Sequence, residues 1–164
     1  MKIYAIQVRT GSEEAFVKYM NNKNNFGLYK FHCPKRELKE RKQGKLIAVS
    51  KPVFSSYVFL ETNKLTHYDY FNQPYTIRFL PSNENIKPLV NKDLEIIKYF
   101  LNSKGVLKVK YDENDRIVIL EGALKGYEGQ IEKVDRRKGR AKIRLDLYDD
   151  SFTIDLAFEV MGAA

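Results

Sequence analysis

Residues 116–147 read RIVILEGALKGYEGQIEKVDRRKGRAKIRLDL, and this stretch decides the fold of the C-terminal part of the chain. It opens with a short apolar run rich in β-branched residues, which is followed by glycines at turn-like intervals. From residue 140 the period is strictly two. One face of the expected strand carries Ala141, Ile143, Leu145 and Leu147, and the other carries Arg140, Lys142, Arg144 and Asp146. The pattern predicts a small β unit with a core face and a cationic face.

The same stretch predicts a basic β-hairpin over residues 133–144, with its turn at 135–139. Seven of these twelve residues are cations, opposed only by Asp135: Lys133, Arg136, Arg137, Lys138, Arg140, Lys142 and Arg144. Such a concentration of cations could bridge phosphates across a groove of structured RNA. Arginine can both fork onto phosphate and stack on bases, so Arg136, Arg137 and Arg140 are the first candidates. The alternative is an ordinary solvated hairpin.

Three motifs carry a resemblance to a known family. GALKGYEGQIEKVD at 122–135 resembles the KOW motif, which builds an SH3-like barrel in ribosomal proteins and NusG-type transcription factors. IYAIQVRTG at 3–11 and VSKPVFSSYVFLE at 49–61 resemble the opening strand and the FPGYVFV-type strand of the NusG N-terminal domain. The resemblance covers nearly the whole chain in the family's order. It implies an α+β fold, in which an antiparallel sheet flanked by helices precedes a small SH3-like β-barrel.

A chain of 164 residues with 43% hydrophobic residues can form two small ordered domains. We expect an N-terminal domain at 1–105, a linker at 106–113 and a barrel at 114–164. The net charge of +8 is uneven, because residues 1–109 hold 19 cations against 9 acids and residues 110–164 hold 10 against 12. The excess in the N-terminal part favours polyanionic partners.

The N-terminal part has an α+β pattern of elements. Ser12 follows the first expected strand and is placed to cap a helix. A basic hairpin arm is expected to turn at Gly44. The expected elements are a strand at 2–8, an amphipathic helix, the arm at 35–51, a strand at 53–60, a short helix at 68–71, a strand at 76–80 and a helix at 93–101.

The residues argue against an enzyme. GALKGYEG lacks the Gly-Lys-Ser/Thr ending of a phosphate-binding loop and leads into strand periodicity. Adjacent His32 and Cys33 would point to opposite faces of a strand, so they form no nucleophile and base pair. Only His67 adds a further soft ligand, which disfavours a structural zinc site. We therefore predict no catalytic residues, no metal and no cofactor.

Cys33 is the single cysteine, so no intramolecular disulfide is expected. The opening residues lack a secretory pattern, and no apolar run reaches the length of about 18 residues that a membrane helix requires. We therefore expect a cytoplasmic protein, most simply a monomer.

The resemblance assigns a partner to three aromatic residues. In NusG-type proteins the two strands matched here line an aromatic cavity that grips the clamp helices of RNA polymerase's largest subunit. Tyr4, Phe54 and Tyr57 occupy the matching positions. The alternative is that these side chains are core residues. The chain departs from the family at Ser55-Ser56, where Pro-Gly is usual. The arm at 35–51 is either solvated or faces polymerase or non-template DNA.

GKLIAVSKP at 44–52 resembles the specialised paralogues of the RfaH and LoaP kinds, which are antiterminators. This resemblance implies processive antitermination, with the KOW domain contacting a hairpin in the nascent leader RNA. Two alternatives remain open. One is a housekeeping NusG whose barrel contacts a termination helicase or a ribosomal protein. The other is a ribosome-associated KOW protein whose RNA affinity does not depend on polymerase.

Overall fold

The computed structural model describes residues 2–23, 29–63, 65, 76–148 and 150–162. The chain divides into two units, each described below by itself. The N-terminal unit comprises Met1–Pro34 and Phe54–Leu94, and the C-terminal unit comprises Lys35–Val53 and Glu95–Ala164. The division differs from the predicted domains at 1–105 and 114–164. That these two segments fold independently stays a prediction.

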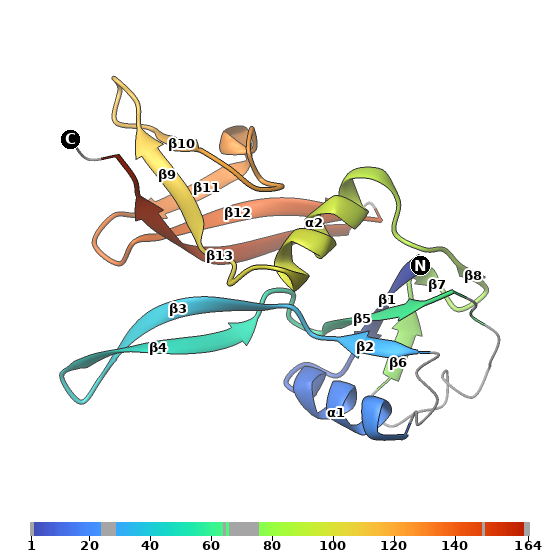
Figure 1. Ribbon diagram of the computed structural model, residues 1–164. Coiled ribbons are helices and arrows are strands. Elements are labelled where there is room, and N and C mark those ends of the chain that lie inside the picture. Colours follow the sequence, from blue (N-terminus) through green and yellow to red (C-terminus); the bar gives the residue numbers. More distant parts are fainter. Residues whose placement is uncertain (1, 24–28, 64, 66–75, 149, 163–164) are drawn as a thin grey trace. The chain divides into compact units, whose positions relative to one another are not determined.

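The N-terminal unit is built on a four-stranded antiparallel sheet with the order β2-β5-β1-β6 (Figure 1). Its strands are β1 (Lys2–Val8), β2 (Lys30–His32), β5 (Tyr57–Thr62) and β6 (Thr76–Phe79). The predicted strands at 2–8 and 76–80 are confirmed. The strand predicted at 53–60 begins at Tyr57 instead, because the four residues before it form bends and a turn.

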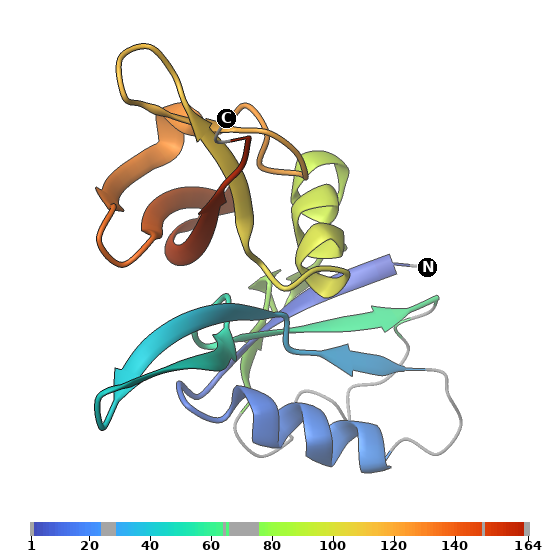
Figure 2. The ribbon, with the colours of Figure 1, turned by 60° about the vertical axis from the view of Figure 1, so that its left-hand side comes forward.

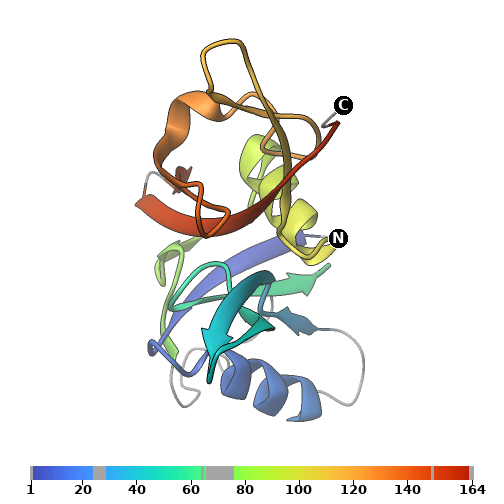
Figure 3. The same ribbon diagram turned by 90° about the vertical axis from the view of Figure 1, so that its left-hand side faces the viewer.

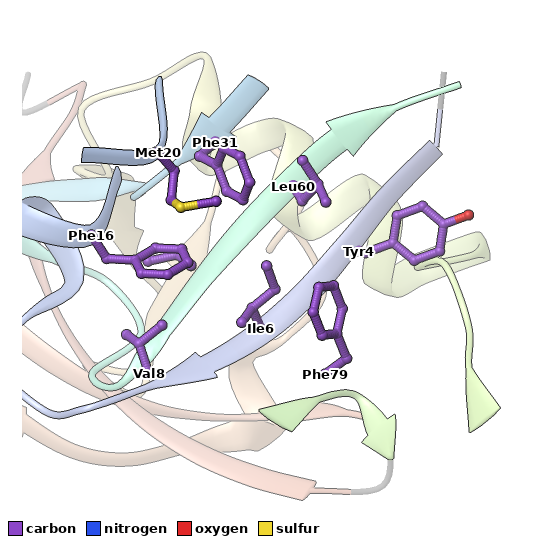
Figure 4. Close-up of a cluster of buried hydrophobic side chains, with 9 residues drawn as sticks. Tyr4, Ile6, Val8, Phe16, Met20, Phe31, Leu60 and Phe79 are labelled. Atoms are coloured by element: carbon purple, nitrogen blue, oxygen red, sulfur yellow. The ribbon is translucent and has the colours of Figure 1, made fainter. Parts of the chain in front are cut away.

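Helix α1 (Glu13–Lys23) covers one face of this sheet (Figure 2). It begins directly after Ser12, whose carbonyl accepts the first helical hydrogen bond from the Phe16 N–H at 2.9 Å. The helix packs Phe16 and Met20 into the core, where Phe16 meets Phe31 edge to face at 5.7 Å. Figure 4 shows this core, to which β1 contributes alternate residues: Tyr4, Ile6 and Val8.

Two short strands, β7 (Pro81–Ser82) and β8 (Asn85–Ile86), form a small hairpin later in the N-terminal unit. The short helix predicted at 68–71 lies outside the described residues. The helix predicted at 93–101 is confirmed as α2 (Asn91–Leu101), which buries Ile96, Ile97 and Phe100.

The C-terminal unit contains a five-stranded sheet with the order β10-β9-β13-β12-β11. Figure 3 shows this sheet curling into an incomplete barrel. The elements are β9 (Leu107–Tyr111), β10 (Ile117–Ile119), the 3-10 turn η2 (Glu128–Gln130), β11 (Ile131–Asp135), β12 (Arg140–Leu147) and β13 (Asp150–Val160). All neighbours are antiparallel except β9 and β13. The strand alternation predicted from residue 140 is confirmed, since Ala141, Ile143, Leu145 and Leu147 are buried.

The segment predicted as a linker, 106–113, instead holds strand β9. Leu107 and Val109 are buried, while Lys108 and Lys110, which alternate with them, are exposed. The acidic residues that indicated a linker form the turn to β10, where the Asp112 carboxylate accepts the Arg116 N–H at 2.9 Å. The expectation of a linker was therefore wrong at this segment, because a short alternating strand is hard to distinguish from a charged loop.

The basic arm forms the predicted hairpin of β3 (Lys35–Lys42) and β4 (Lys45–Pro52). Gln43 and Gly44 both have positive φ angles, 51° and 77°, as a two-residue hairpin turn requires. The hairpin belongs to the C-terminal unit, where the Glu37 N–H donates to the Lys104 carbonyl at 2.8 Å. Leu38 is buried in this unit, so the arm is not only a solvated extension.

Candidate functional site

Two of the three candidate aromatic residues lie at the start of β5. Phe54 is 1% exposed and meets Phe59 edge to face, with ring centroids 5.8 Å apart. Tyr57 is half-buried. Tyr57 and Phe59 share one face of β5, because residues two apart on a strand point the same way. The structure therefore brings Phe54, Tyr57 and Phe59 to one side of the sheet.

Tyr4 lies on the other side of that sheet. Its partner across β1 and β5 is Leu60, whereas Tyr57 pairs with Gln7. Directly paired residues share a face and successive residues alternate, so Tyr4 and Tyr57 point in opposite directions. Tyr4 belongs to the core beneath α1, and this burial raises the pKa of its hydroxyl. The three aromatic residues do not line a single cavity, and Tyr4 fits the alternative of a core residue.

The Ser55-Ser56 pair keeps the backbone geometry that Pro-Gly would give. Ser56 has a φ of 74°, and the Tyr57 N–H donates to the Phe54 carbonyl at 3.2 Å. A type II turn has this hydrogen bond and a positive φ at its third residue, where glycine is favoured. Proline is common at its second residue. Ser-Ser in place of the usual Pro-Gly therefore leaves the turn between Phe54 and Tyr57 in place.

The seven candidate RNA-binding cations lie on the β11–β12 hairpin, but their environments differ. Lys133, Arg137, Lys138 and Lys142 are exposed. The Lys138 N–H donates to the Asp135 carboxylate at 3.0 Å, which fixes the turn and holds the pKa of that carboxyl below its usual range. Arg137 and Lys138 therefore project from an ordered turn, as the sequence predicted.

Arg140 is held within the protein. Its side chain is 17% exposed, lies 3.7 Å from the Asp155 carboxylate and donates to the Lys39 carbonyl at 2.9 Å. Glu40 adds a second carboxylate at 4.0 Å. These partners come from β3 and β13, so nothing local to the hairpin sequence could have revealed them. Arg140 serves packing within the C-terminal unit and is a poor choice for a phosphate contact.

Arg136 and Arg144 also have partners in the C-terminal unit. The Arg136 guanidinium stacks on the Tyr111 ring at 4.4 Å and donates to the Asp115 carbonyl. Arg136 and Tyr111 line a groove of about 740 Å³ bordered by residues of β10 and β11. Arg144 donates to the Ser151 hydroxyl at 3.0 Å. Arg136 stays exposed, so its outer face remains open to a partner.

A concavity of about 180 Å³ lies on the cationic face of the hairpin. It is lined by four cations and two acids: Lys133, Lys138, Arg140, Lys142, Asp135 and Asp155. Lys133 and Lys142 are direct partners across β11 and β12. Like charges placed directly opposite destabilise a strand pair, and here the repulsion is partly offset because Lys142 also lies opposite Asp155 across β12 and β13. With four cations against two acids, the lining carries net positive charge and favours an anion over a cation.

The family model described as "Transcription termination factor nusG" matches residues 1–98, more than half of the chain. The chain belongs to the NusG family. NusG-family proteins are transcription factors that bind RNA polymerase. The family is one of transcription termination and antitermination, and the chain's resemblance to NusG is thereby confirmed.

Individual relatives agree with the NusG assignment. The transcription termination/antitermination protein NusG of Campylobacter jejuni is 26% identical, over 96% of this chain and 94% of its own length. The protein of the same name from Rickettsia bellii is 25% identical, over 73% of this chain and 64% of its own length. A solved structure described as "Domain interaction in Thermotoga maritima NusG" aligns with a TM-score of 0.61 at 18% identity. It covers 95% of this chain and 93% of that one, which confirms the predicted fold class.

Two further observations concern the described residues alone. None of their helices has the length and apolar character needed to cross a membrane. Within the same residues, no three His, Cys, Asp or Glu side chains gather as a metal site would require. His67, which was considered as a zinc ligand, lies outside the described residues.

Proposed function

We propose that this NusG-family protein is an elongation factor that binds the clamp helices of RNA polymerase through Tyr57 and promotes processive antitermination. Phe54, which is 1% exposed, supports Tyr57 from the core and makes no direct contact. The observation that carries the polymerase contact is the ordered turn before β5, which presents a half-buried tyrosine beside a buried Phe54–Phe59 pair. Aromatic side chains anchored in this way commonly dominate the free energy of an interface. Tyr4 contributes only by supporting the sheet from its other side.

The polymerase contact is tested by measuring the affinity of the full chain for a clamp-helix fragment of the largest subunit. Tyr57→Ala should weaken binding by about tenfold or more, as expected for an interface anchor. Tyr19→Ala is the matched control, because Tyr19 is 47% exposed on α1 and lies away from the turn. Equal affinities for the parent and the Tyr57→Ala variant would remove this residue from the interface.

The proposal also gives the β11–β12 hairpin an RNA contact. It is supported by the exposed cations around the 180 Å³ concavity, whose lining holds four cations against two acids. The sequence first indicated Arg136, Arg137 and Arg140, but Arg140 forms an ion pair with Asp155. The residues now proposed for the contact are Arg137, Lys138 and Lys142. Arg136 remains a secondary candidate for stacking on a base.

RNA binding is tested with a structured leader hairpin over a range of salt concentrations. Replacing Arg137, Lys138 and Lys142 by Ala should lower affinity and reduce the salt slope by about 2 to 3, since each lost phosphate contact removes somewhat less than one unit. The control is the triple alanine variant at Lys18, Lys110 and Lys125, which removes the same charge from exposed positions elsewhere. Parallel salt slopes for the two triple variants would indicate only a general charge effect.

The sign of the effect on termination is tested by transcription with purified polymerase across a terminator downstream of the leader. Antitermination predicts more read-through when the protein is added, and less of this increase with the Arg137, Lys138 and Lys142 variant. Increased termination would instead favour the housekeeping type of NusG. RNA affinity without any polymerase binding would favour the ribosome-associated alternative.

A further inference from the structure

Glu13 is a buried acid at the first residue of α1. It is 4% exposed, and Thr62 is the only other polar residue in the buried part of the described chain. Removing a carboxylate from water costs several kcal/mol unless hydrogen bonds compensate it. Its position at a helix N-terminus helps, because the helix dipole stabilises negative charge there. The sequence alone gave no sign of this, since Glu13 and Glu14 look like an ordinary acidic first turn.

The carboxylate of Glu13 accepts two backbone hydrogen bonds through one oxygen. Its Oε1 accepts the Ser56 N–H at 2.7 Å and the Gly11 N–H at 3.2 Å. Ser56 is 43 residues away along the chain and lies in the turn before β5. Hydrogen bonds to a charged acceptor are stronger than those between neutral groups. Glu13 therefore joins the start of α1 to the turn that precedes Tyr57.

Ser56 needs such support because of its backbone conformation. Its φ of 74° lies in the left-handed region, which is unfavourable for a residue with a Cβ. The Ser56 carbonyl accepts the Val8 N–H at 2.8 Å, and its hydroxyl contacts the Thr10 hydroxyl. Glu13 supplies the remaining contact, on the N–H side of the same residue. Pro-Gly would adopt this turn without external support, whereas Ser-Ser depends on it.

We propose that Glu13 is a positioning residue for polymerase binding, which holds Ser56 in its left-handed conformation so that Phe54 and Tyr57 keep their places. The inference rests on the proposed contact between Tyr57 and the polymerase clamp. Glu13 is buried and touches no partner itself. It acts through the backbone of the turn, so its loss should be compensated by residues that favour the same turn.

The test uses the full chain and the clamp-helix fragment, with unfolding midpoints measured in parallel. Glu13→Ala should lower affinity about tenfold, the effect expected from losing one hydrogen bond to a charged group. Glu13→Gln keeps an oxygen acceptor and should bind nearly as the parent does. Glu14→Ala removes an equal charge from the exposed neighbour and should leave affinity unchanged.

The deciding variant combines Glu13→Ala with Ser55→Pro and Ser56→Gly. If Glu13 acts through the turn, this triple variant should recover most of the lost affinity, even where Glu13→Ala alone is too unstable to assay. A folded triple variant that binds as weakly as Glu13→Ala overturns the inference. Parental affinity of Glu13→Ala, alongside weak binding of Tyr57→Ala, also overturns it and leaves the proposed function intact. Parental affinity of both variants removes the proposed polymerase contact itself.

Discussion

Strands β5 and β12 differ in how clearly their sequences show which side chains are buried. In β12, buried Ala141, Ile143 and Leu145 alternate with exposed cations, because one face meets the core and the other meets water. In β5, Val58, Phe59 and Leu60 are consecutive and all have 0% exposure, so both faces of the strand are covered. Alternation reveals the direction of a side chain only where one face is solvated.

The difference explains why the cationic candidates are easier to place than the aromatic ones. Period two by itself assigns Lys142 and Arg144 to the outer face of β12. No such pattern separates Tyr4 from Tyr57, since both strands that carry them are apolar on each side. Their opposite directions follow from the register of β1 against β5, which depends on pairings far apart in sequence.

The largest expected effect tests the opposite directions of Tyr4 and Tyr57. Tyr4→Ala should reduce the free energy of unfolding by about 4 kcal/mol, because it empties an aromatic position in the core under α1. Tyr57→Ala should cost about 1 kcal/mol, since that side chain is only half-buried. Urea unfolding of both variants measures the gap. Similar losses would mean that the two tyrosines share one environment.

The next effect tests the two faces of β12. Ile143→Ala should cost about 3 kcal/mol, the usual loss for a buried branched aliphatic residue. Lys142→Ala, one residue away and exposed, should stay within about 0.5 kcal/mol of the parent. Chemical unfolding monitored in the C-terminal unit measures both. A large loss for Lys142→Ala would show that the cationic face is structural and unavailable to RNA.

Sequence predicted much of this fold wherever local pattern and solvent exposure agree. The strand at 2–8, the arm turning at Gly44 and the hairpin turning near Gly139 all have residue types that favour their backbone conformations. Strand β9 was missed because its two buried residues alternate with lysines beside an acidic turn. The glycines after residue 120 predicted turns of a small β unit, and Gly122, Gly126 and Gly139 have positive φ angles between its strands.

The candidate sites were predictable only as residue types. The sequence shows seven cations on a hairpin, but it does not show that Asp155 and Glu40 surround Arg140 from other strands. It shows a Ser-Ser pair where Pro-Gly is usual, but it does not show that Glu13 supports the turn. These contacts join residues far apart in the chain. The type of a charged residue does not show whether its side chain is solvated or paired.

A smaller effect tests the turn that leads into β5. Ser55→Pro with Ser56→Gly, in the otherwise unchanged protein, should raise the free energy of unfolding by about 0.5–1 kcal/mol, because both residues already favour this backbone conformation. Thermal and urea unfolding measure the gain. The control is Gln43→Gly at another turn with a positive φ angle, that of the arm. A loss of stability for the Ser55 and Ser56 double variant would mean that the side chains of the serines matter more than the backbone.

The smallest effect tests whether water is excluded from the face of β5 that carries Tyr57 and Phe59. His32 serves as the reporter. His32 pairs with Phe59 across β2 and β5, and its side chain is 19% exposed. Burial lowers the pKa of His32, and Lys30 lowers it further, while Glu61 with its oxygen 3.7 Å from Nε2 opposes the shift. The Nε2 atom is buried and has no hydrogen-bond partner in the described part of the chain. The neutral form is therefore favoured in the folded state.

The sign of the pH dependence follows from this lowered pKa. The unfolded chain takes up the proton near the ordinary value of about 6.5, while the folded chain resists it to lower pH. The stability due to neutral His32 is thus complete above about pH 6.5 and declines as the pH falls toward the folded pKa. Between about pH 7.5 and 5.5 the parent should lose more stability than His32→Gln, as measured by urea unfolding at each pH. Carboxylates remote from His32 are common to both proteins, so their titration cancels in the difference. Parallel curves would show that water reaches the imidazole and that this face of β5 is more open than its buried neighbours indicate.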